Sequence, residues 1–311
     1  MKAYYCDHFV LPLPETHRFP ITKYSRLRGR IESSGLELEL VEPRPADDTL
    51  LRRVHDADYV TRTQSGALDK KAVRRMGFPW SPQLVERSRR SVGATVAAAE
   101  TALGGDGVAV NLAGGTHHAF ADRGEGFCVF NDAAVAIRHQ QALGRIDRAL
   151  IVDCDVHQGN GSAAIFRDDP SVFTLSMHGR RNYPFQKETS DLDVELEDGT
   201  GDDEYLDGLE AALDRVLPVA GAQLVIYLAG ADPFSGDKLG RLGLSKDGLQ
   251  ARDRLVLERC RQAGLPVAVA MAGGYAPAVE DIVDIHFNTV REALRSFSAQ
   301  AAQAPASIRA P

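Results

Sequence analysis

Three side chains that can bind a metal ion follow a short apolar run near the middle of the chain. Ala149 to Val152 is followed by Asp153, Asp155 and His157, and glycines come next. An apolar run bounded by glycine is typical of a fully buried strand in a parallel sheet. Successive residues of an extended chain point to opposite faces, so the three side chains are expected on one side. A carboxylate and an imidazole placed together are half of a divalent metal site.

Three other apolar runs end in the same way, with glycine followed by a polar functional group. They cover 107–112, 224–228 and 265–271, and they lead to the pair His117 and His118, to Asp232 and to Tyr275. The carboxyl ends of parallel strands meet at one edge of a sheet, where open α/β sheets bind ligands. Asp155, His157 and Asp232 are sufficient for a catalytic metal, because three protein ligands leave one position open for water or substrate.

The other groups at this edge have more than one interpretation. The adjacent histidines suit proton transfer, because imidazole titrates near neutral pH, but they could also be two metal ligands. A functionless pair of surface histidines is disfavoured, because the pair follows a run expected to be a buried strand. Tyr275 follows two glycines and could donate its hydroxyl to a developing oxyanion, or it could simply pack as an aromatic ring. A single polar group at a strand end is usually structural, whereas four such ends at one edge favour a functional site.

Strands that alternate with helices predict a mostly parallel sheet covered by helices on both faces. The 311 residues suffice for one large α/β domain, which we expect over 1–297, and the tail 298–311 is expected to be disordered. Thr22 and Ser81 are expected to cap helices that begin at the residues after them. The acidic segment 187–203 is expected to be solvated.

The composition limits the classes of function. The chain is 44% apolar and 25% charged, and its formal net charge of −7 leaves no basic surplus for direct binding of nucleic acid. Its four cysteines are scattered without a Cys-x-x-Cys pair, which favours reduced thiols over a disulfide framework. The N-terminus lacks the apolar stretch of a signal peptide, and no run approaches membrane-spanning length. These features predict a soluble, cytoplasmic protein with no membrane partner.

Five motifs, taken together, resemble the histone deacetylase and acetylpolyamine amidohydrolase superfamily. In the family's order they are Gly-Gly-Thr-His-His-Ala (114–119), Gly-Phe-Cys-Val-Phe-Asn-Asp (126–132), Asp-Cys-Asp-Val-His-Gln-Gly-Asn-Gly (153–161), Gly-Ala-Asp-Pro-Phe-Ser-Gly-Asp (230–237) and Gly-Gly-Tyr (273–275). The segments 158–160 and 203–206 look most like the class IV histone deacetylase branch. The resemblance covers residues 1–297 and implies an arginase-like α/β fold, a three-layer sandwich with a mostly parallel central sheet.

The resemblance also implies a role for each matching residue. The matches are Asp155, His157 and Asp232 to the zinc ligands, His117 and His118 to the tandem catalytic histidines, Asp153 to the carboxylate behind the first histidine, Tyr275 to the oxyanion donor, and Gly126, Phe127 and Leu239 to the lining of the acyl-lysine tunnel. A structural potassium ion is implied beside Asp153, Asp155, His157 and Ser176. Backbone carbonyls do much of the binding at such a site.

Asn160 stands where many members of the family have a second aspartate. A neutral amide can still orient His118, but it does not stabilise an imidazolium as a carboxylate does. We therefore expect a lower pKa for His118 than an aspartate would give, and an altered pH dependence. The class IV branch shares this asparagine, so the residue does not indicate an inactive protein.

The implied activity is that of a zinc-dependent amidohydrolase that removes acetyl or longer acyl groups from the ε-amino group of lysine in a protein or peptide. The alternative substrate is an acetylpolyamine or another small acylated amine, because the acidic segment could attract a cation. An arginase-like ureohydrolase would need a second metal, but Gln158 and Gly159 stand where a bridging aspartate is required. A non-catalytic protein that binds acylated amines is a third class.

Overall fold

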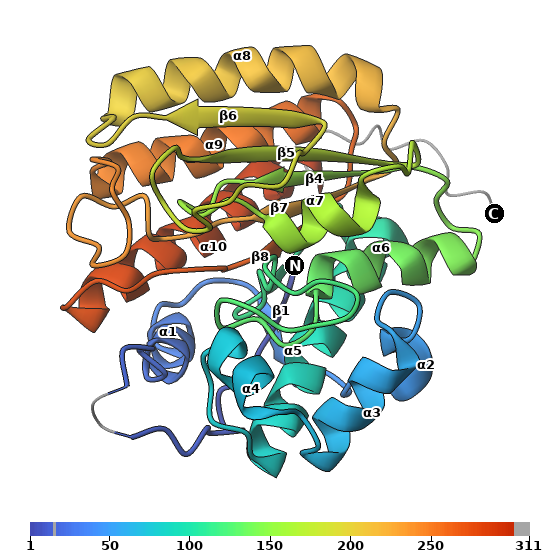
Figure 1. Cartoon of the computed structure of the whole chain (residues 1–311). Helices are drawn as coiled ribbons and strands as arrows, with labels where there is room; N and C mark the ends of the chain where they lie inside the picture. Colours follow the sequence, from blue (N-terminus) through green and yellow to red (C-terminus); the bar gives the residue numbers. More distant parts are fainter. Residues whose placement is uncertain (15–16, 302–311) are drawn as a thin grey trace.

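The computed structural model describes residues 1–14 and 17–301, whose eight strands form one sheet (Figure 1). The strands are β1 (Lys2–Tyr4), β2 (Glu39–Val41), β3 (Val108–Asn111), β4 (Ala149–Asp153), β5 (Val172–Gly179), β6 (Leu192–Leu196), β7 (Leu224–Leu228) and β8 (Val267–Ala270). Their order is β2-β1-β3-β8-β7-β4-β5-β6, and all neighbours are parallel. The four strands predicted to carry the functional groups are therefore neighbours at the centre of the sheet.

Helices cover both faces of this sheet. They are α1 (Lys23–Glu32), α2 (Asp48–Leu51), α3 (Ala57–Ser65), α4 (Lys70–Met76), α5 (Pro82–Thr101), a π-helical turn (Ala102–Asp106), α6 (Asp132–Ala142), α7 (Asn160–Phe166), α8 (Asp202–Ala220), α9 (Lys246–Gln262) and α10 (Val279–Ala301). Helices α8, α9 and α10 lie on one side of the sheet in Figure 1, and α5 and α6 lie on the other. The predicted three-layer α/β fold is confirmed.

Each face of the sheet has its own hydrophobic core, and alternate residues of one strand enter different cores. In β4, Leu150 and Val152 pack toward α8, α9 and α10, whereas Ala149 and Ile151 pack toward α5 and α6. This alternation follows from the period of two in a strand. Because both faces are covered, the strand needs apolar residues at every position, which explains the unbroken apolar run.

The structure differs from the sequence-based expectations at several element ends. The segment 187–203 contains β6, an edge strand in which apolar residues alternate with acidic ones, so only one face is solvated. Thr22 does precede α1, but its side chain makes no capping bond, whereas that of Ser81 accepts from the Leu84 N–H. Helix α10 continues to Ala301, so the first residues of the tail expected to be disordered are helical, and 302–311 lie outside the described residues.

Two expectations about the chain's surroundings can be compared with the structure. Cys6, Cys128, Cys154 and Cys260 are buried and unpaired, as expected for reduced thiols. Across the residues that the structure describes, none of the helices combines the length and the apolar character needed to cross a membrane.

Candidate active site

The four central strands bring the predicted functional residues together at their carboxyl ends. Strand β4 ends at Asp153, and the chain then bends through 155–157 instead of staying extended. The side chains still alternate, because Cys154 and Val156 enter the core below α9 while Asp155 turns toward the site. The loops after β3, β7 and β8 supply the histidine pair, the second aspartate and the tyrosine.

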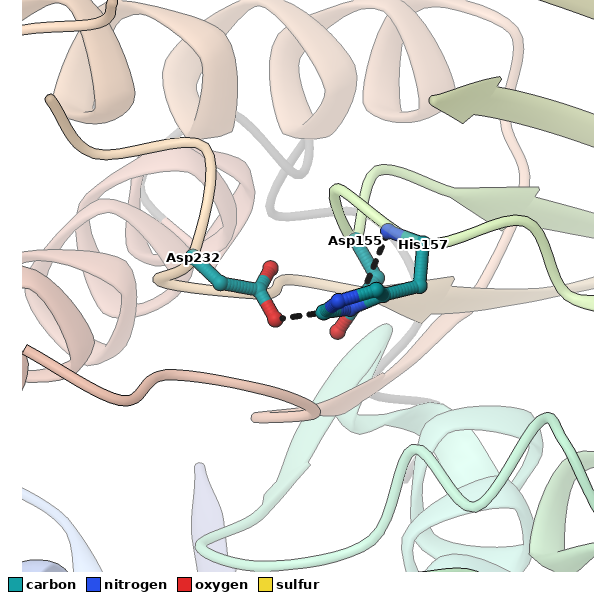
Figure 2. A group of neighbouring side chains, drawn as sticks. All are labelled: Asp155, His157 and Asp232. Carbon is teal, nitrogen blue, oxygen red and sulfur yellow. Dashed lines mark hydrogen bonds and ion pairs between the residues drawn. The ribbon is translucent and has the colours of Figure 1, made fainter. Parts of the chain in front are cut away.

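Asp155, His157 and Asp232 form a buried group whose ligand atoms lie within 4.8 Å of one another. Figure 2 shows both carboxylates directed at the imidazole of His157, and its Nδ1 lies 2.9 Å from Oδ1 of Asp155 and 3.3 Å from Oδ2 of Asp232. The other oxygens are bonded to backbone, since the Gly273 N–H donates to Oδ2 of Asp155 and the Val156 N–H donates to Oδ1 of Asp232. Among the described residues, only the imidazole of His157 lies beside the buried Oδ2 of Asp232, and no backbone N–H donates to this oxygen. Two carboxylates and one imidazole therefore fit a divalent ion, with a ligand position left open.

Two glycines keep space free around these carboxylates. A Cβ atom on Gly273 would lie 1.9 Å from Oδ2 of Asp232, and one on Gly230 would lie 2.8 Å from Oδ2 of Asp155. Neither distance is compatible with a side chain at these positions. The glycines that follow β7 and β8 in the sequence are therefore part of the construction of the site.

The buried carboxylates make this group strongly favour a positive charge. Burial alone would lower the pKa of His157, but hydrogen bonds and charge from Asp155 and Asp232 raise it to about 10. Burial, and then the charge of Asp155, raise the pKa of Asp232 to about 6. Concentrated buried negative charge is the electrostatic setting of a cation site.

The two adjacent histidines have different partners and opposite pKa shifts. Nδ1 of His117 lies 2.6 Å from Oδ2 of Asp153, and Nδ1 of His118 lies 2.6 Å from Oδ1 of Asn160. Burial opposes protonation of His117, but Asp153 and Asp155 outweigh it and raise its pKa to about 9. Burial, and then the charges of the neighbouring histidines, hold the pKa of His118 well below its ordinary value. The partners of His117 thus favour its protonated form, and the surroundings of His118 favour its neutral form.

Asn160→Asp is expected to move the acidic limb of the kcat/KM profile to higher pH. An aspartate beside Nδ1 would stabilise the imidazolium of His118 and raise its pKa. His118 would then stay protonated, and unable to accept a proton, up to a higher pH. Activity should therefore fall most at acidic pH, which a profile from about pH 5 to about pH 9 would measure. An acidic limb that does not move would contradict the assignment of that limb to His118.

Tyr275 sits on a turn that a buried lysine holds in place. Nζ of Lys23 donates to the carbonyls of Ala272 and Gly274, at 3.2 Å and 3.4 Å, and lies 5.6 Å from the centre of the Tyr275 ring. The Tyr275 N–H donates to Oδ2 of Asp237 at 2.6 Å. Burial, followed by the charges of the metal-site aspartates, raises the pKa of Tyr275 well above its ordinary value, so its hydroxyl remains a donor.

A cavity of about 470 Å³ leads from the surface to these groups. Gly126, Phe127 and Leu239 line it, together with His118, His157 and Tyr275 at its inner end. Tyr183 also lines it, with its ring 5.1 Å from that of His118. The three predicted tunnel residues therefore lie where a side chain inserted from outside would pass.

An arginine on α9, pointing into the molecule, ties together two of the loops that carry the aspartates. Nη1 of Arg252 donates to the carbonyl of Cys154 at 3.2 Å and to that of Gly230 at 2.6 Å. Oδ1 of Asp253 accepts from Nε and Nη2 of the same arginine at 2.9 Å and 2.8 Å, and both side chains are fully buried. Burial disfavours the guanidinium charge, but Asp253 and its neighbours raise the pKa of Arg252 well above its ordinary value.

Asp253→Ala is expected to lower the free energy of unfolding by about 3–5 kcal/mol, because it leaves a buried guanidinium without its counter-charge. The hydroxyls of Tyr227 and Thr289 would also lose an acceptor. Urea unfolding followed by circular dichroism would measure the loss. The matched control is Asp207→Ala on the exposed face of α8, which should change stability by less than about 0.5 kcal/mol. Equal effects of the two substitutions would contradict the role given to the buried pair.

The sequence did not indicate several of these supporting residues. Arg252 and Asp253 lie on a helix rich in charged residues, and such charges are normally solvated. Asp132 belongs to a recognised motif without an assigned role, and it accepts bonds from the N–H groups of Gly115 and Thr116 that shape the histidine turn. The predicted potassium site stays a prediction, and the Ser176 hydroxyl lies 2.9 Å from Nδ1 of His178.

Together the fold and the site define a parallel α/β protein with a buried Asp–His–Asp group that could hold a metal ion. Residues 17–290 match the family model described as the histone deacetylase domain. An uncharacterised protein of Picosynechococcus is 47% identical over 91% of this chain and 94% of its own length. Histone deacetylase 2 of Arabidopsis thaliana is 35% identical over 86% and 72%. The crystal structure of an acetylpolyamine aminohydrolase from Burkholderia pseudomallei shares the fold, with a TM-score of 0.79 and 20% identity over 95% and 99%.

This chain belongs to the histone deacetylase family, and it is a hydrolase that acts on amide bonds. The predicted membership of the superfamily is confirmed. The narrower assignment to the class IV branch stays a prediction.

Proposed function

We propose that the protein is a zinc-dependent amidohydrolase that removes acetyl or longer acyl groups from the ε-amino group of lysine. One observation carries this proposal. His157 of the Asp–His–Asp group, His118 and Tyr275 line one cavity beside Phe127, and the same three residues line an adjoining pocket that Asp155 also lines. An extended acyl-lysine side chain would present its amide carbonyl there.

The proposed reaction assigns a separate task to each group. A divalent ion held by the Asp–His–Asp group would polarise the amide carbonyl and acidify the attacking water. His118, neutral at working pH, accepts the proton of that water and returns it to the departing amine. Tyr275 donates its hydroxyl to the oxyanion that develops on the carbonyl. The cationic His117, held by Asp153, stabilises the negative charge of the transition state.

Zinc is the proposed ion, and the donor set supports it without excluding others. An imidazole nitrogen and two carboxylate oxygens are zinc ligands, and three protein ligands with one open position are typical of catalytic zinc. Iron(II) and cobalt accept the same donors. A structural potassium ion near Ser176 belongs to the same proposal.

Acyl-lysine is preferred to acetylpolyamine because of the charge at the cavity mouth. Arg18, Arg181, Lys238 and Arg241 line its outer part. A polyamine would carry further ammonium groups into this positive region, whereas an acyl-lysine peptide need bring none. The expectation that the acidic segment attracts a cation to the site is therefore not favoured.

A substrate panel tests the proposed function. Metal-loaded protein would be given an acetyl-lysine peptide, a myristoyl-lysine peptide and acetylspermidine, and the free amine would be measured. Turnover of the lysine peptides is expected, with loss on chelation and recovery on adding back zinc. Turnover of acetylspermidine alone would favour the small-amine alternative. Tight binding of all three without turnover would favour a binding protein.

A further inference from the structure

Positive charge at the mouth of the cavity exceeds the negative charge paired with it. Arg18, Arg181, Lys238 and Arg241 are all exposed. Asp198 lies 3.8 Å from Arg181 and 3.1 Å from Arg241, so two of the cations share a single carboxylate. In the part of the chain that the structure describes, no other carboxylate forms an ion pair with any of the four. We call these four residues the cationic rim.

Asp237 is the carboxylate next to Lys238 in the chain, but its oxygens are already engaged. Oδ1 accepts from the N–H groups of Leu239 and Gly240 at 2.8 Å and 2.9 Å, and Oδ2 accepts from that of Tyr275. These bonds fix Asp237 to the backbone that shapes the cavity wall. Over residues 1–14 and 17–301, Arg18 and Lys238 therefore form no ion pair and Arg181 and Arg241 share Asp198, which leaves an excess of positive charge to meet charges brought by a substrate.

We infer that the cationic rim selects acyl-lysine substrates with acidic residues beside the modified lysine. The inference rests on the proposed lysine deacylase function. Carboxylates one to three residues from a lysine in the cavity would lie within the screening length of the rim, which is about 8 Å at physiological ionic strength. Such complementarity acts on the rate of productive encounter and on partner choice, and it weakens with salt.

Three peptides that differ only around one acetyl-lysine test this selection. Their flanking residues would be aspartate, glutamine or arginine. The expected order of kcat/KM is acidic, neutral, basic, with about three- to tenfold per step at low salt and a smaller spread at high salt. Lys238→Glu combined with Arg241→Glu should reverse the order. Arg215→Glu, an exposed charge change on α8, is the matched control and should preserve it.

The outcomes separate this inference from the proposed function. Equal turnover of all three peptides, or an order unchanged in the rim variant, would overturn the inference but leave the deacylase function standing. If no peptide is hydrolysed, the proposed function fails. The affinities of fluorescently labelled peptides would then test the rim inference. The acidic peptide should bind most tightly to the unaltered protein, and the rim variant should reverse the order.

A second inference concerns how the proton-accepting histidine is held. Nδ2 of Asn160 donates to Oε1 of Glu125 at 3.3 Å, while Oδ1 of the same amide faces His118. The Tyr183 hydroxyl donates to the same Glu125 oxygen, and Nε of Arg123 lies 3.6 Å from Oε2. Glu125 is 15% exposed and lies on the loop between the motif that contains the two histidines (114–119) and the motif that contains Phe127 (126–132). A carboxylate thus stands directly behind the amide.

The geometry points to Glu125 as a positioning residue that sets the tautomer of His118. A carboxylate accepts only, so it fixes which end of the Asn160 amide turns toward it. The amide oxygen is then left to face Nδ1 of His118, which must carry the proton. Nε2 is thereby left as the base. Without Glu125 the amide could turn over, and its N–H₂ group would force the proton onto Nε2. This role rests on the proposed use of His118 as the base.

An aspartate at 160 would remove the need for Glu125, because both of its oxygens accept. Glu125→Ala alone should lower kcat about tenfold with little change in KM. Asn160→Asp alone places two carboxylates together. The double variant Glu125→Ala with Asn160→Asp should regain activity over Glu125→Ala, with its acidic limb at higher pH. Asp122→Ala removes an exposed carboxylate from the same loop as a matched control and should leave kcat unchanged.

Recovery in the double variant is the decisive result. If the fold-reduction in kcat of the double variant equals the product of the fold-reductions of the two single variants, the role of Glu125 is overturned. ¹⁵N NMR of the His118 ring reports the tautomer whether or not the protein turns over a substrate. A population protonated at Nδ1 in the unaltered protein that persists in Glu125→Ala would also overturn it. Absence of turnover in the unaltered protein would instead count against the proposed function.

Discussion

Asp155→Ala is expected to lower kcat/KM by about a thousandfold or more and to remove the bound metal ion. The substitution takes away one of three ligands, together with the acceptor of the Gly273 N–H. Lewis-acid activation supplies several kcal/mol of transition-state stabilisation, and each 1.4 kcal/mol is about a factor of ten in rate. Metal content per chain and kcat/KM would be measured on the same preparation, because the two losses should occur together.

The control for this change is Asp168→Ala, which removes an exposed aspartate after α7 and should preserve both metal and activity. Circular dichroism would establish that Asp155→Ala is folded. A folded Asp155→Ala protein that turns over substrate at the normal rate would contradict the assignment of the metal centre. Retained activity in a preparation without metal would contradict it as well.

Tyr275→Phe is expected to lower kcat by about a hundred- to a thousandfold while leaving KM nearly unchanged, as for the loss of one oxyanion donor. The phenylalanine ring would keep its contacts with Phe127 and Phe19, whose ring centres lie 5.9 Å and 6.2 Å away. The raised pKa of Tyr275 keeps the hydroxyl protonated, so this effect should not depend on pH between neutral and mildly alkaline conditions.

Steady-state kinetics with an acetyl-lysine peptide would separate the two parameters for Tyr275→Phe. The matched comparison is Tyr59→Phe, which removes a buried hydroxyl that donates to the Val129 carbonyl. That change should lower stability without altering kcat. A rise in KM with unchanged kcat for Tyr275→Phe would indicate a binding role instead of oxyanion stabilisation.

The strand ends explain why so much of this site could be predicted from the sequence. A buried parallel strand is continuously apolar, so a charged group at its end stands out, as Asp153 and Asp232 do. Parallel pairing then places all such ends at one edge without further information. The fold class and the grouping of His117, Asp155 and Tyr275 follow from these two rules together with the family motifs.

The supporting residues could not be predicted in the same way, because their environment is set by tertiary contacts. Arg252 is typical of a solvated helix position, and only the packing of α9 against the sheet turns it toward the Cys154 and Gly230 carbonyls. Glu125 has the sequence context of an ordinary polar loop residue. The only signal for its role was that the Asn160 amide N–H₂ would need an acceptor, which Glu125 supplies. The many acidic residues in 187–203 favour a solvated loop over a strand, although apolar and acidic residues alternate in β6.

Arg252 on α9 is hydrogen-bonded to the two loops that carry Asp155 and Asp232. Binding of an ion between these loops should therefore be coupled to the local stability of α9. An ion that binds only the folded chain stabilises it by an amount that grows with its free concentration. Helix α9 and both loops would then open together, and opening would release the ion. If an ion binds there, its free concentration is therefore expected to affect how slowly the protein is degraded, in addition to its activity. Scarcity of the ion would be visible first as a shorter lifetime of the protein.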